Sequence, residues 1–388
     1  MNAHSNRPAP GRMVVLATGG TGGHVFPAAA LAEVLAQRGC ELALFTDRRG
    51  IALPNGLAAL PVERLAGTAM AGKGIGGRIL AVTELTRGVW QAARRLRHYR
   101  PAAVVGFGGY ASVPTVLAAA RAGIPTVLHE QNAVLGRANR VAVRRAKAIC
   151  TSFEIVEGLA AVTGGPTTRT GNPVRAAIAA LRDQPYPTPI PGGPLSILVT
   201  GGSQGARVFS DVLPQALALL TNQERARIIL AQQCRAEAIE AAAAAYDRLG
   251  VNVELLPFFA DMPQRLAHAQ LVIARSGASS IAELTAAGRP AILVPYPHAI
   301  DDHQTANAEA VSAAGGAWLM PQEGFTGPAV AQRLRDMLDK PLKLAEAASC
   351  ARALGVPDAA ERLAGVVEQF LPATNGNSRP GERLEAAQ

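Results

Sequence analysis

The chain has 388 residues, 49% of them hydrophobic, and is therefore long enough to form two globular domains. Its formal net charge of +9 favours an acidic partner, which leaves nucleic acid, a phosphorylated substrate or an anionic membrane as candidates. Because only 4% of the residues are aromatic, stacking platforms for single-stranded nucleic acid are not expected.

The four cysteines are widely separated and form no C-x-x-C pair, which is typical of buried thiols in a reducing compartment. Residues 1–12 are polar and lack the apolar core of a signal peptide, and no apolar run reaches the length of a membrane-spanning helix. We therefore expect a cytoplasmic protein whose contact with membranes is peripheral, with disordered tails at 1–12 and 372–388.

A glycine-rich loop follows the first predicted strand, residues 13–17. Thr-Gly-Gly-Thr-Gly-Gly-His fills residues 18–24, and a helical pattern opens at Pro27. Such a loop lets the backbone approach a ligand, and the N–H groups at a helix start favour an anion. The spacing matches neither the dinucleotide fingerprint nor the Walker loop. His24 lies where the loop becomes a helix, within reach of a bound substrate; the alternative is a tight turn with a capping histidine.

A basic segment follows at residues 73–100, which are rich in Lys and Arg and contain a single acidic residue, Glu84. Apolar residues at near-helical spacing predict an amphipathic helix that suits an anionic bilayer surface. The alternative is a helix face that packs on the first domain, and for the C-terminal part of the segment both interpretations stand equally. The residues assigned to the membrane are Lys73, Ile75, Arg78, Ile79 and Arg87.

Strand-like and helix-like stretches alternate along the chain, which predicts an α/β fold with parallel sheets covered by helices on both faces. Prolines and glycines crowd residues 183–194 and predict a linker between two doubly wound domains. The predicted strands are 13–17, 41–45, 103–107, 126–129 and 148–151 before the linker, and 195–200, 228–231, 251–256, 271–274 and 291–294 after it.

Further glycine-rich turns follow predicted strands at residues 106–110 and 201–206. Since open parallel sheets bind ligands at the carboxyl ends of their strands, these turns predict a cleft between the domains for a phosphate-bearing ligand. Glu283, one turn into the helix after residues 275–280, could accept hydrogen bonds from ribose hydroxyls; the alternative is an acidic residue that favours the helix dipole. The polar cluster at 302–307 suits a polyhydroxylated ligand. No H-E-x-x-H motif is present, and no metal is expected.

Seven motifs, in order, resemble those of the MurG family, the glycosyltransferases of peptidoglycan synthesis. They are GGTGGHVFPAAALAEVL, GFGGYASVP, LHEQNAVLGRANR, TGNPVR, GGSQGAR, RSGASSIAE and DDHQTANA. The resemblance covers residues 13–370 and implies the GT-B architecture, two Rossmann-like domains that face a cleft. The expected boundaries are 13–182, a linker at 183–194, 195–350, and a C-terminal helix at 351–371 that returns to the first domain.

The resemblance also implies a reaction: inverting, metal-independent transfer of N-acetylglucosamine from UDP-N-acetylglucosamine. The acceptor would be the C4 hydroxyl of N-acetylmuramic acid in undecaprenyl-pyrophosphoryl-muramoyl-pentapeptide (lipid I), and the product lipid II. The other partners implied are the anionic cytoplasmic leaflet of the plasma membrane and other cell-wall synthesis and division proteins. No cofactor and no nucleic acid are expected.

The resemblance assigns the donor to a set of residues from both domains. Glu283 would hold the ribose, Arg175 and Ser203 the diphosphate, Phe259 the uracil through its backbone, and Gln304 with Asn307 the sugar. The full set is Thr21, Gly22, Gly23, Asn132, Arg175, Ser203, Phe259, Ala278, Ser279, Ser280, Ile281, Ala282, Glu283, Gln304 and Asn307.

Around the acceptor, the resemblance implicates His24, Glu130, Tyr110, Gly108 and Gly109. His24 is the expected general base because the ordinary pKa of an imidazole lies near neutrality, and Glu130 is the second candidate. In place of a metal held by D-x-D, Arg175 and helix N-termini would stabilise the departing UDP.

Two other classes remain as alternatives. A UDP-N-acetylglucosamine 2-epimerase would share the architecture and the donor but would need catalytic carboxylates in the cleft. A basic nucleic-acid-binding protein would explain the charge but would leave the glycine-rich loops without a role.

Overall fold

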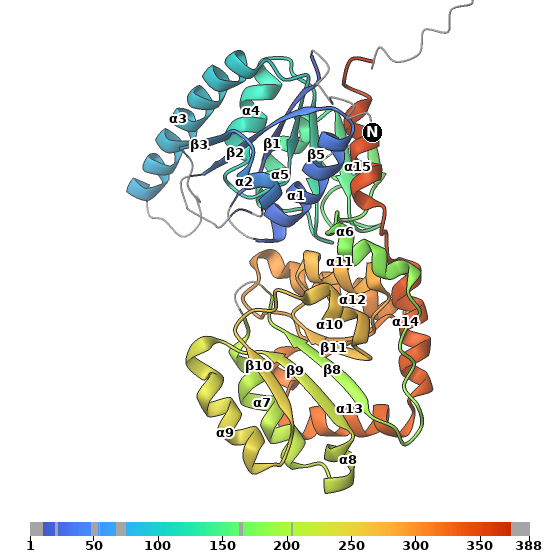
Figure 1. Cartoon of the computed structure of the whole chain (residues 1–388). Helices are drawn as coiled ribbons and strands as arrows, with labels where there is room; N and C mark the ends of the chain where they lie inside the picture. Colours follow the sequence, from blue (N-terminus) through green and yellow to red (C-terminus); the bar gives the residue numbers. More distant parts are fainter. Residues whose placement is uncertain are drawn as a thin grey trace, which may run out of the picture.

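The computed structural model describes residues 11–19, 22–47, 53, 55–66, 75–162, 166–202 and 205–373. These residues form two parallel sheets, each covered by helices on both faces, in two domains that lie one above the other in Figure 1. The predicted α/β class with two doubly wound, Rossmann-like domains is confirmed.

The first sheet has seven strands in the order β3-β2-β1-β4-β5-β6-β7. Its strands are β1 (Met13–Ala17), β2 (Glu41–Asp47), β3 (Val62–Leu65), β4 (Ala103–Gly106), β5 (Thr126–Glu130), β6 (Ala148–Thr151) and β7 (Thr167–Arg169). Its helices are α1 (Gly22–Gln37), α2 (Asn55–Ala58), α3 (Ile75–Tyr99), α4 (Val113–Arg121), α5 (Arg137–Ala142) and the 3₁₀ turn η1 (Val143–Arg145).

The strands of this sheet are apolar on both faces because helices cover both. In β1, Val14 and Leu16 pack into the layer that contains α1, whereas Val15 and Ala17 pack into the layer of α3 and α4. The order of the strands reverses between β1 and β4, the position at which sheets of this kind bind ligands.

The second sheet has six strands in the order β10-β9-β8-β11-β12-β13 and reverses between β8 and β11. Its strands are β8 (Leu195–Thr200), β9 (Ile228–Gln233), β10 (Val253–Leu256), β11 (Leu271–Ala274), β12 (Ala291–Leu293) and β13 (Ala317–Leu319). Its helices are α6 (Ala176–Ala179), η2 (Ala180–Asp183), α7 (Arg207–Ala218), α8 (Asn222–Ala226), η3 (Ala236–Ala238), α9 (Ile239–Arg248), α10 (Met262–His268), α11 (Ala278–Ala287), η4 (Ile300–Asp302), α12 (His303–Ala313), η5 (Gln322–Gly324), α13 (Gly327–Asp339) and α14 (Leu342–Leu354).

The chain enters the second domain earlier than predicted. Val174, Ile178 and Leu181 pack in the core of the second domain, so the boundary at residue 182 is too late. The physical reason is that α6 and η2 offer an apolar face to α11 before the proline-rich segment begins. That segment runs along the second domain, where Tyr186 donates a hydrogen bond to the Gln270 carbonyl at 2.6 Å.

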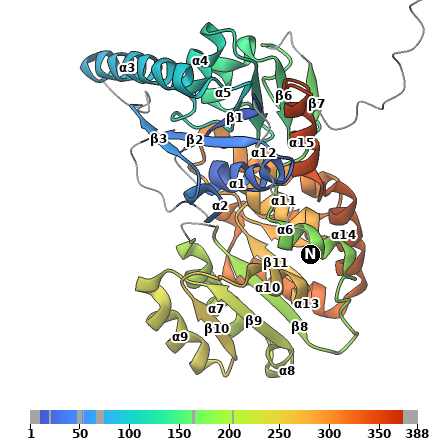
Figure 2. The same ribbon diagram turned by 45° about the horizontal axis from the view of Figure 1, so that its top comes forward.

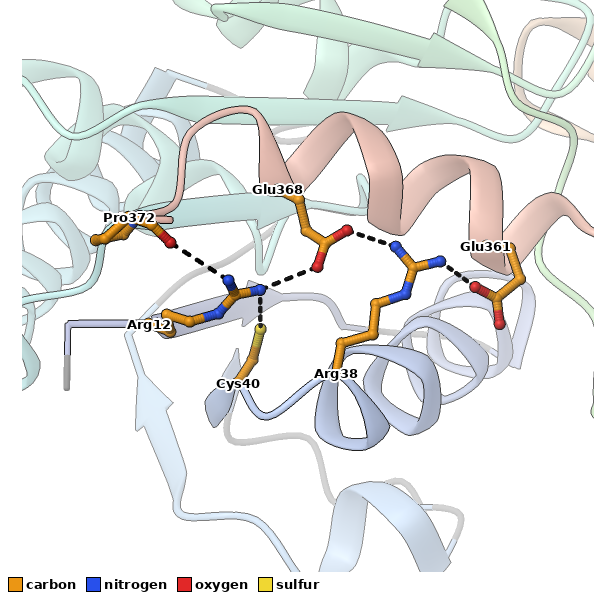
Figure 3. A network of polar contacts seen from close by, with 6 residues as sticks. All are labelled: Arg12, Arg38, Cys40, Glu361, Glu368 and Pro372. Carbon is orange, nitrogen blue, oxygen red and sulfur yellow. Dashed lines mark hydrogen bonds and ion pairs between the residues drawn. The ribbon is translucent and has the colours of Figure 1, made fainter. Parts of the chain in front are cut away.

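The chain returns to the first domain after α14, and α15 (Ala359–Glu368) packs against α1. Leu363, Ala364 and Val367 of α15 lie in the first core. Figure 3 shows the polar contacts that border this interface: Glu368 accepts from Arg12 at 2.9 Å and from Arg38 at 2.5 Å, and Arg38 also pairs with Glu361.

Helix α3 lies at the outer side of the first domain, away from α15, in both Figure 1 and Figure 2. One face of it packs on the domain through Ala92 and Leu96. None of the helices in the described ranges is long and apolar enough to cross a membrane.

Candidate active site at the domain interface

The imidazole of His24 lies in the first turn of α1, next to the turn that follows β4. A side-chain carbon added at Gly108 would lie 3.5 Å from His24 Cε1, and one added at Gly109 would lie 3.3 Å from Cδ2. Both glycines have positive φ angles, of 80° and 72°. Since Nε2 lies between Cε1 and Cδ2, glycine at these positions keeps Nε2 clear of side chains.

The surroundings of His24 keep its ring neutral near pH 7. Burial lowers its pKa below the ordinary value of 6.5. Three groups oppose this shift: Gln131, whose Oε1 lies 3.1 Å from His24 Nδ1, the Glu130 carboxylate and the Phe107 carbonyl. Nearby His303 lowers the pKa further. A half-buried neutral imidazole is a suitable proton acceptor at a ring nitrogen that does not itself donate a hydrogen bond.

Glu130, the second candidate for the base, is only 2% exposed and is fully engaged. Its Oε1 accepts from the backbone N–H of Asn132 at 3.0 Å, and its Oε2 accepts from the backbone N–H of Gly136 at 2.9 Å and from Asn139 at 2.8 Å. These bonds shape the loop between β5 and α5. Within the described ranges, both carboxylate oxygens of Glu130 therefore bond to groups of this loop.

Asn132 and Asn307 lie in different domains and bond to each other. Asn307, with 0% exposure, donates to Asn132 Oδ1 at 3.1 Å and to the Ser276 carbonyl at 3.1 Å, and its Oδ1 accepts from the backbone N–H of Ala133 at 2.8 Å. The carboxyl end of β5 is thereby joined to the carboxyl end of β11. Both residues were expected at the donor, and here they bridge the two domains.

Arg175 and Glu283, also expected at the donor, form an ion pair in which Arg175 Nη2 lies 2.9 Å from Glu283 Oε1. Burial raises the pKa of Glu283, and the charge of Arg175 opposes that shift. Among the described residues, Arg175 Nε has no hydrogen-bond partner although it is buried. Because this nitrogen is buried, a ligand could reach it only if the side chain moved.

The N-terminus of α11 lies against the N-terminal turn of α1, where Ser279 Oγ is 3.5 Å from the Gly23 carbonyl. Ala278 and Ile281 are buried, whereas Ser279, Ser280 and Ala282 are half-buried, as are Gly22 and Gly23. The start of α1 at residues 22–24 and the start of α11, two helix starts that the sequence singled out, therefore lie side by side.

The loop before α12 is strained and is held from the first domain. Asp301 and Asp302 have φ angles of 53° and 48°, in the left-handed region that disfavours residues other than glycine. Arg137 of α5 forms an ion pair with Asp301, in which Arg137 Nη2 lies 2.6 Å from Asp301 Oδ1 and Arg137 Nε lies 3.0 Å from Asp301 Oδ2. The half-buried Tyr110 lies beside Arg137: the pKa of that guanidinium is raised chiefly by Asp301, and in part by Tyr110.

The side chains of Gln304 and Phe259 make contacts within the protein. Gln304 Oε1 accepts from the backbone N–H of Tyr296 at 2.9 Å. The Phe259 ring, 2% exposed, lies in the second core with the Arg265 guanidinium 4.1 Å from its centroid. A contact between Phe259 and a base would have to use its backbone, as the resemblance implies.

Several predicted residues cannot be placed. Thr21, Ser203 and Lys73 lie outside the described residues, and the side chains of Ile75, Arg78 and Ile79 do as well. The exposed part of α3 carries Arg87 together with Val82, which is 50% exposed, and Trp90, which is 64% exposed. Val89 instead packs inward, so the predicted apolar stripe is divided between the surface and the core.

The sequence reasoning missed Gln131, His129, Arg137 and Asp301. His129 and Gln131 are two apart at the end of β5, so the strand period was the available signal that they share a side. The contact between Arg137 and Asp301 joins residues that are far apart in the chain and had no such signal. Within the described ranges, no three His, Cys, Asp or Glu side chains are grouped as metal ligands.

Two family models match the chain. The glycosyltransferase family 28 N-terminal domain matches residues 14–151, and the glycosyltransferase family 28 C-terminal domain matches residues 196–363. The UDP-N-acetylglucosamine–N-acetylmuramyl-(pentapeptide) pyrophosphoryl-undecaprenol N-acetylglucosamine transferase of Rhodospirillum centenum is 54% identical over 375 residues, which cover 97% of this chain and 99% of that protein.

Solved structures agree in architecture. The crystal structure of Acinetobacter baumannii MurG is 30% identical with a TM-score of 0.73, and the match covers 92% of this chain and 99% of that one. A putative UDP-N-acetylglucosamine 2-epimerase from Listeria monocytogenes is 18% identical with a TM-score of 0.63, over 92% of this chain and 96% of that one. This second likeness is one of fold alone, so it lends the epimerase interpretation nothing beyond a common architecture.

Proposed function

The chain belongs to the MurG family of N-acetylglucosaminyltransferases, has the GT-B architecture, and we propose that its two domains use the site described above for the transfer. The donor is UDP-N-acetylglucosamine, the acceptor is undecaprenyl-pyrophosphoryl-muramoyl-pentapeptide, and the reaction belongs to peptidoglycan synthesis. The observation that carries this function is the 54% identity to the Rhodospirillum centenum transferase over 97% of the chain.

The reaction is proposed to be a single displacement with inversion at the anomeric carbon. The C4 hydroxyl oxygen of N-acetylmuramic acid forms a bond to C1 of N-acetylglucosamine, while the bond from C1 to the UDP oxygen breaks and UDP leaves with the electron pair. The hydroxyl proton passes to His24 Nε2. Two features support this base: burial keeps the imidazole neutral, and the turn at Gly108 and Gly109 keeps Nε2 free of neighbouring side chains.

For the donor, we propose an exchange of partners between Arg175 and Glu283. When UDP-N-acetylglucosamine binds, the ribose hydroxyls donate to Glu283, and Arg175 turns to the diphosphate, which its unpartnered Nε also favours. The backbone N–H groups at the start of α11 would add positive potential at the same place. These groups would stabilise the departing diphosphate without a metal ion.

The membrane contact is proposed for the outer face of α3. Val82 and Trp90 are exposed apolar side chains, and Arg87 is exposed on the same helix. An apolar and basic helix face of this kind suits the anionic surface of the cytoplasmic leaflet, where a lipid-linked acceptor is held. The enzyme would then be a peripheral protein on that leaflet.

The experiment that tests the function is a transfer assay with UDP-N-acetylglucosamine labelled in the sugar and a lipid I analogue as acceptor. The label is expected in a lipid-linked disaccharide whose new bond has the configuration opposite to that of the donor. Release of free N-acetylmannosamine, with no labelled lipid, would contradict the transfer and favour the epimerase interpretation.

A further inference from the structure

A chain of hydrogen bonds runs from His24 into the core of the first domain. His24 Nδ1 lies 3.1 Å from Gln131 Oε1, Gln131 Nε2 lies 2.9 Å from His129 Nδ1, and His129 Nε2 lies 2.9 Å from the Gly171 carbonyl. Gln131 is 1% exposed and His129 is 0% exposed. Neither residue faces the reaction, yet both are hydrogen-bonded in line with the group proposed to act as the base.

The hydrogen bond to Gly171, at the far end of this series of hydrogen bonds, determines the tautomer of His129. A backbone carbonyl can only accept a hydrogen bond, so His129 Nε2 must carry the proton that is donated to Gly171. Burial lowers the pKa of His129 to about 4, so the ring is neutral near pH 7. A neutral imidazole with a proton on Nε2 has a lone pair on Nδ1, which can only accept.

The orientation of the Gln131 amide follows from that lone pair. Gln131 Nε2 lies 2.9 Å from His129 Nδ1 and 2.9 Å from the His129 carbonyl, and its two hydrogens satisfy both acceptors. A flipped amide would place its oxygen against two acceptors, which is repulsive. The amide oxygen therefore faces His24, and because that oxygen only accepts, His24 Nδ1 must carry a proton.

We propose that His129 and Gln131 are positioning residues that hold neutral His24 as its Nδ1–H tautomer, so that Nε2 is the atom that takes the acceptor's proton. This inference rests on the proposed role of His24 as the base. Its geometric support is that Nε2 lies on the ring edge that faces Gly108 and Gly109, opposite the edge bonded to Gln131.

The amide fixes the tautomer but raises the basicity of His24 less than a carboxylate would. After proton transfer, the imidazolium keeps its bond from Nδ1 to a neutral oxygen, which stabilises the charge less than an anion would. The charged or titratable groups that face His24 are Glu130 at the end of β5 and His303 on α12, which act in opposite directions on its pKa. His129 lies behind Gln131.

The direct test is the ¹⁵N spectrum of protein labelled in its seven histidines, with the His24 signals assigned by their loss in His24→Ala. At a pH above 7, wild type is expected to show His24 with Nδ1 protonated and Nε2 unprotonated. Gln131→Met, which keeps the length of the side chain but removes its polar atoms, is expected to populate the Nε2–H tautomer. A wild-type His24 protonated at Nε2 would overturn the proposal.

A matched control separates this effect from structural damage. Asn139 is a buried amide that bonds to Glu130 and the His129 carbonyl but not to His24. Asn139→Leu removes an equally buried amide and is expected to leave the His24 tautomer unchanged. If Asn139→Leu changes the tautomer as Gln131→Met does, general loosening of the loop explains both, and the proposal fails.

Kinetics add a second measurement. Gln131→Met is expected to lower kcat about tenfold, the rate equivalent of one hydrogen bond, with unchanged UDP affinity. In a His24→Ala background the same substitution should cause no further loss, because the chain acts only through His24. An equal loss in both backgrounds would overturn the positioning role. Near-wild-type turnover of His24→Ala alone would instead refute the base, while the tautomer spectrum would still report on the hydrogen bonds.

Discussion

Replacing Glu283 by Ala is expected to weaken UDP binding about tenfold. In the ligand-free protein Glu283 accepts from Arg175 at 2.9 Å, so a ribose must replace an existing partner. A hydrogen bond to a charged group contributes about 1.5–3 kcal/mol. When UDP binds, Glu283 exchanges its bond to Arg175 for a bond to the ribose, so Glu283→Ala loses only the difference in free energy between these two bonds. We expect a loss of about 1.4 kcal/mol, which corresponds to a tenfold higher Kd.

Calorimetric titration with UDP measures this loss, and two variants sharpen it. Glu283→Gln keeps an acceptor oxygen of the same reach and is expected to lose less affinity than Glu283→Ala. Arg175→Ala combined with Glu283→Ala should cost less than the sum of the single changes, because the two side chains share one interaction. An unchanged Kd for Glu283→Ala would refute the assignment of Glu283 to the ribose.

The pH dependence of UDP binding gives a further check of the same residue. Burial raises the pKa of Glu283 above its ordinary value of 4.5, although Arg175 opposes the shift. As the pH falls, the carboxylate is therefore protonated earlier than an exposed one, and UDP affinity should decrease. Glu283→Gln should lack this part of the decrease.

Three further predictions concern the metal, the membrane and the domain contact. Transfer activity should persist in excess EDTA, and a loss that magnesium restores would contradict the proposed role of Arg175. Arg87→Glu with Lys73→Glu and Arg78→Glu should release the protein from anionic vesicles, at about 1 kcal/mol for each residue, while transfer to a short-chain soluble acceptor stays intact; equal loss on both acceptors would indicate a structural role. Arg137→Ala should raise the KM for the donor slightly, since an exposed ion pair contributes little, and adding Asp301→Ala should raise it no further; additive effects would show that the two residues act separately.

The sequence was sufficient for β1, β4 and β8 because they are largely apolar runs followed by glycine-rich turns. It was insufficient for β3, β7 and β13. The first two contain charged residues, as in Thr167–Arg169, and lie at the edges of the first sheet, where one side is unpaired. The third is only three residues long, Ala317–Leu319. Short edge strands of this kind are defined by their neighbours and carry little local signal.

The candidate site shows a similar division. Motif resemblance located the residues, but their contacts depend on the docking of two domains. Asn132 and Asn307 bond across that interface, and Glu130 uses its oxygens to hold the loop that follows it. The resemblance assigned Asn132 and Asn307 to the donor and Glu130 to catalysis, and a list of residues does not say which hydrogen-bond partners the protein itself supplies.

The central claim, that His24 accepts the proton of the attacking hydroxyl, is tested most directly by turnover of His24→Ala measured beside its UDP affinity. We expect kcat to fall roughly 10²–10⁴-fold, the usual contribution of a general base, with UDP binding unchanged. The wild-type rate should fall on the acid side with an apparent pKa below 6.5, because burial favours the neutral ring. A His24→Ala enzyme that turns over at nearly the wild-type rate, with the acid limb intact, would contradict the account.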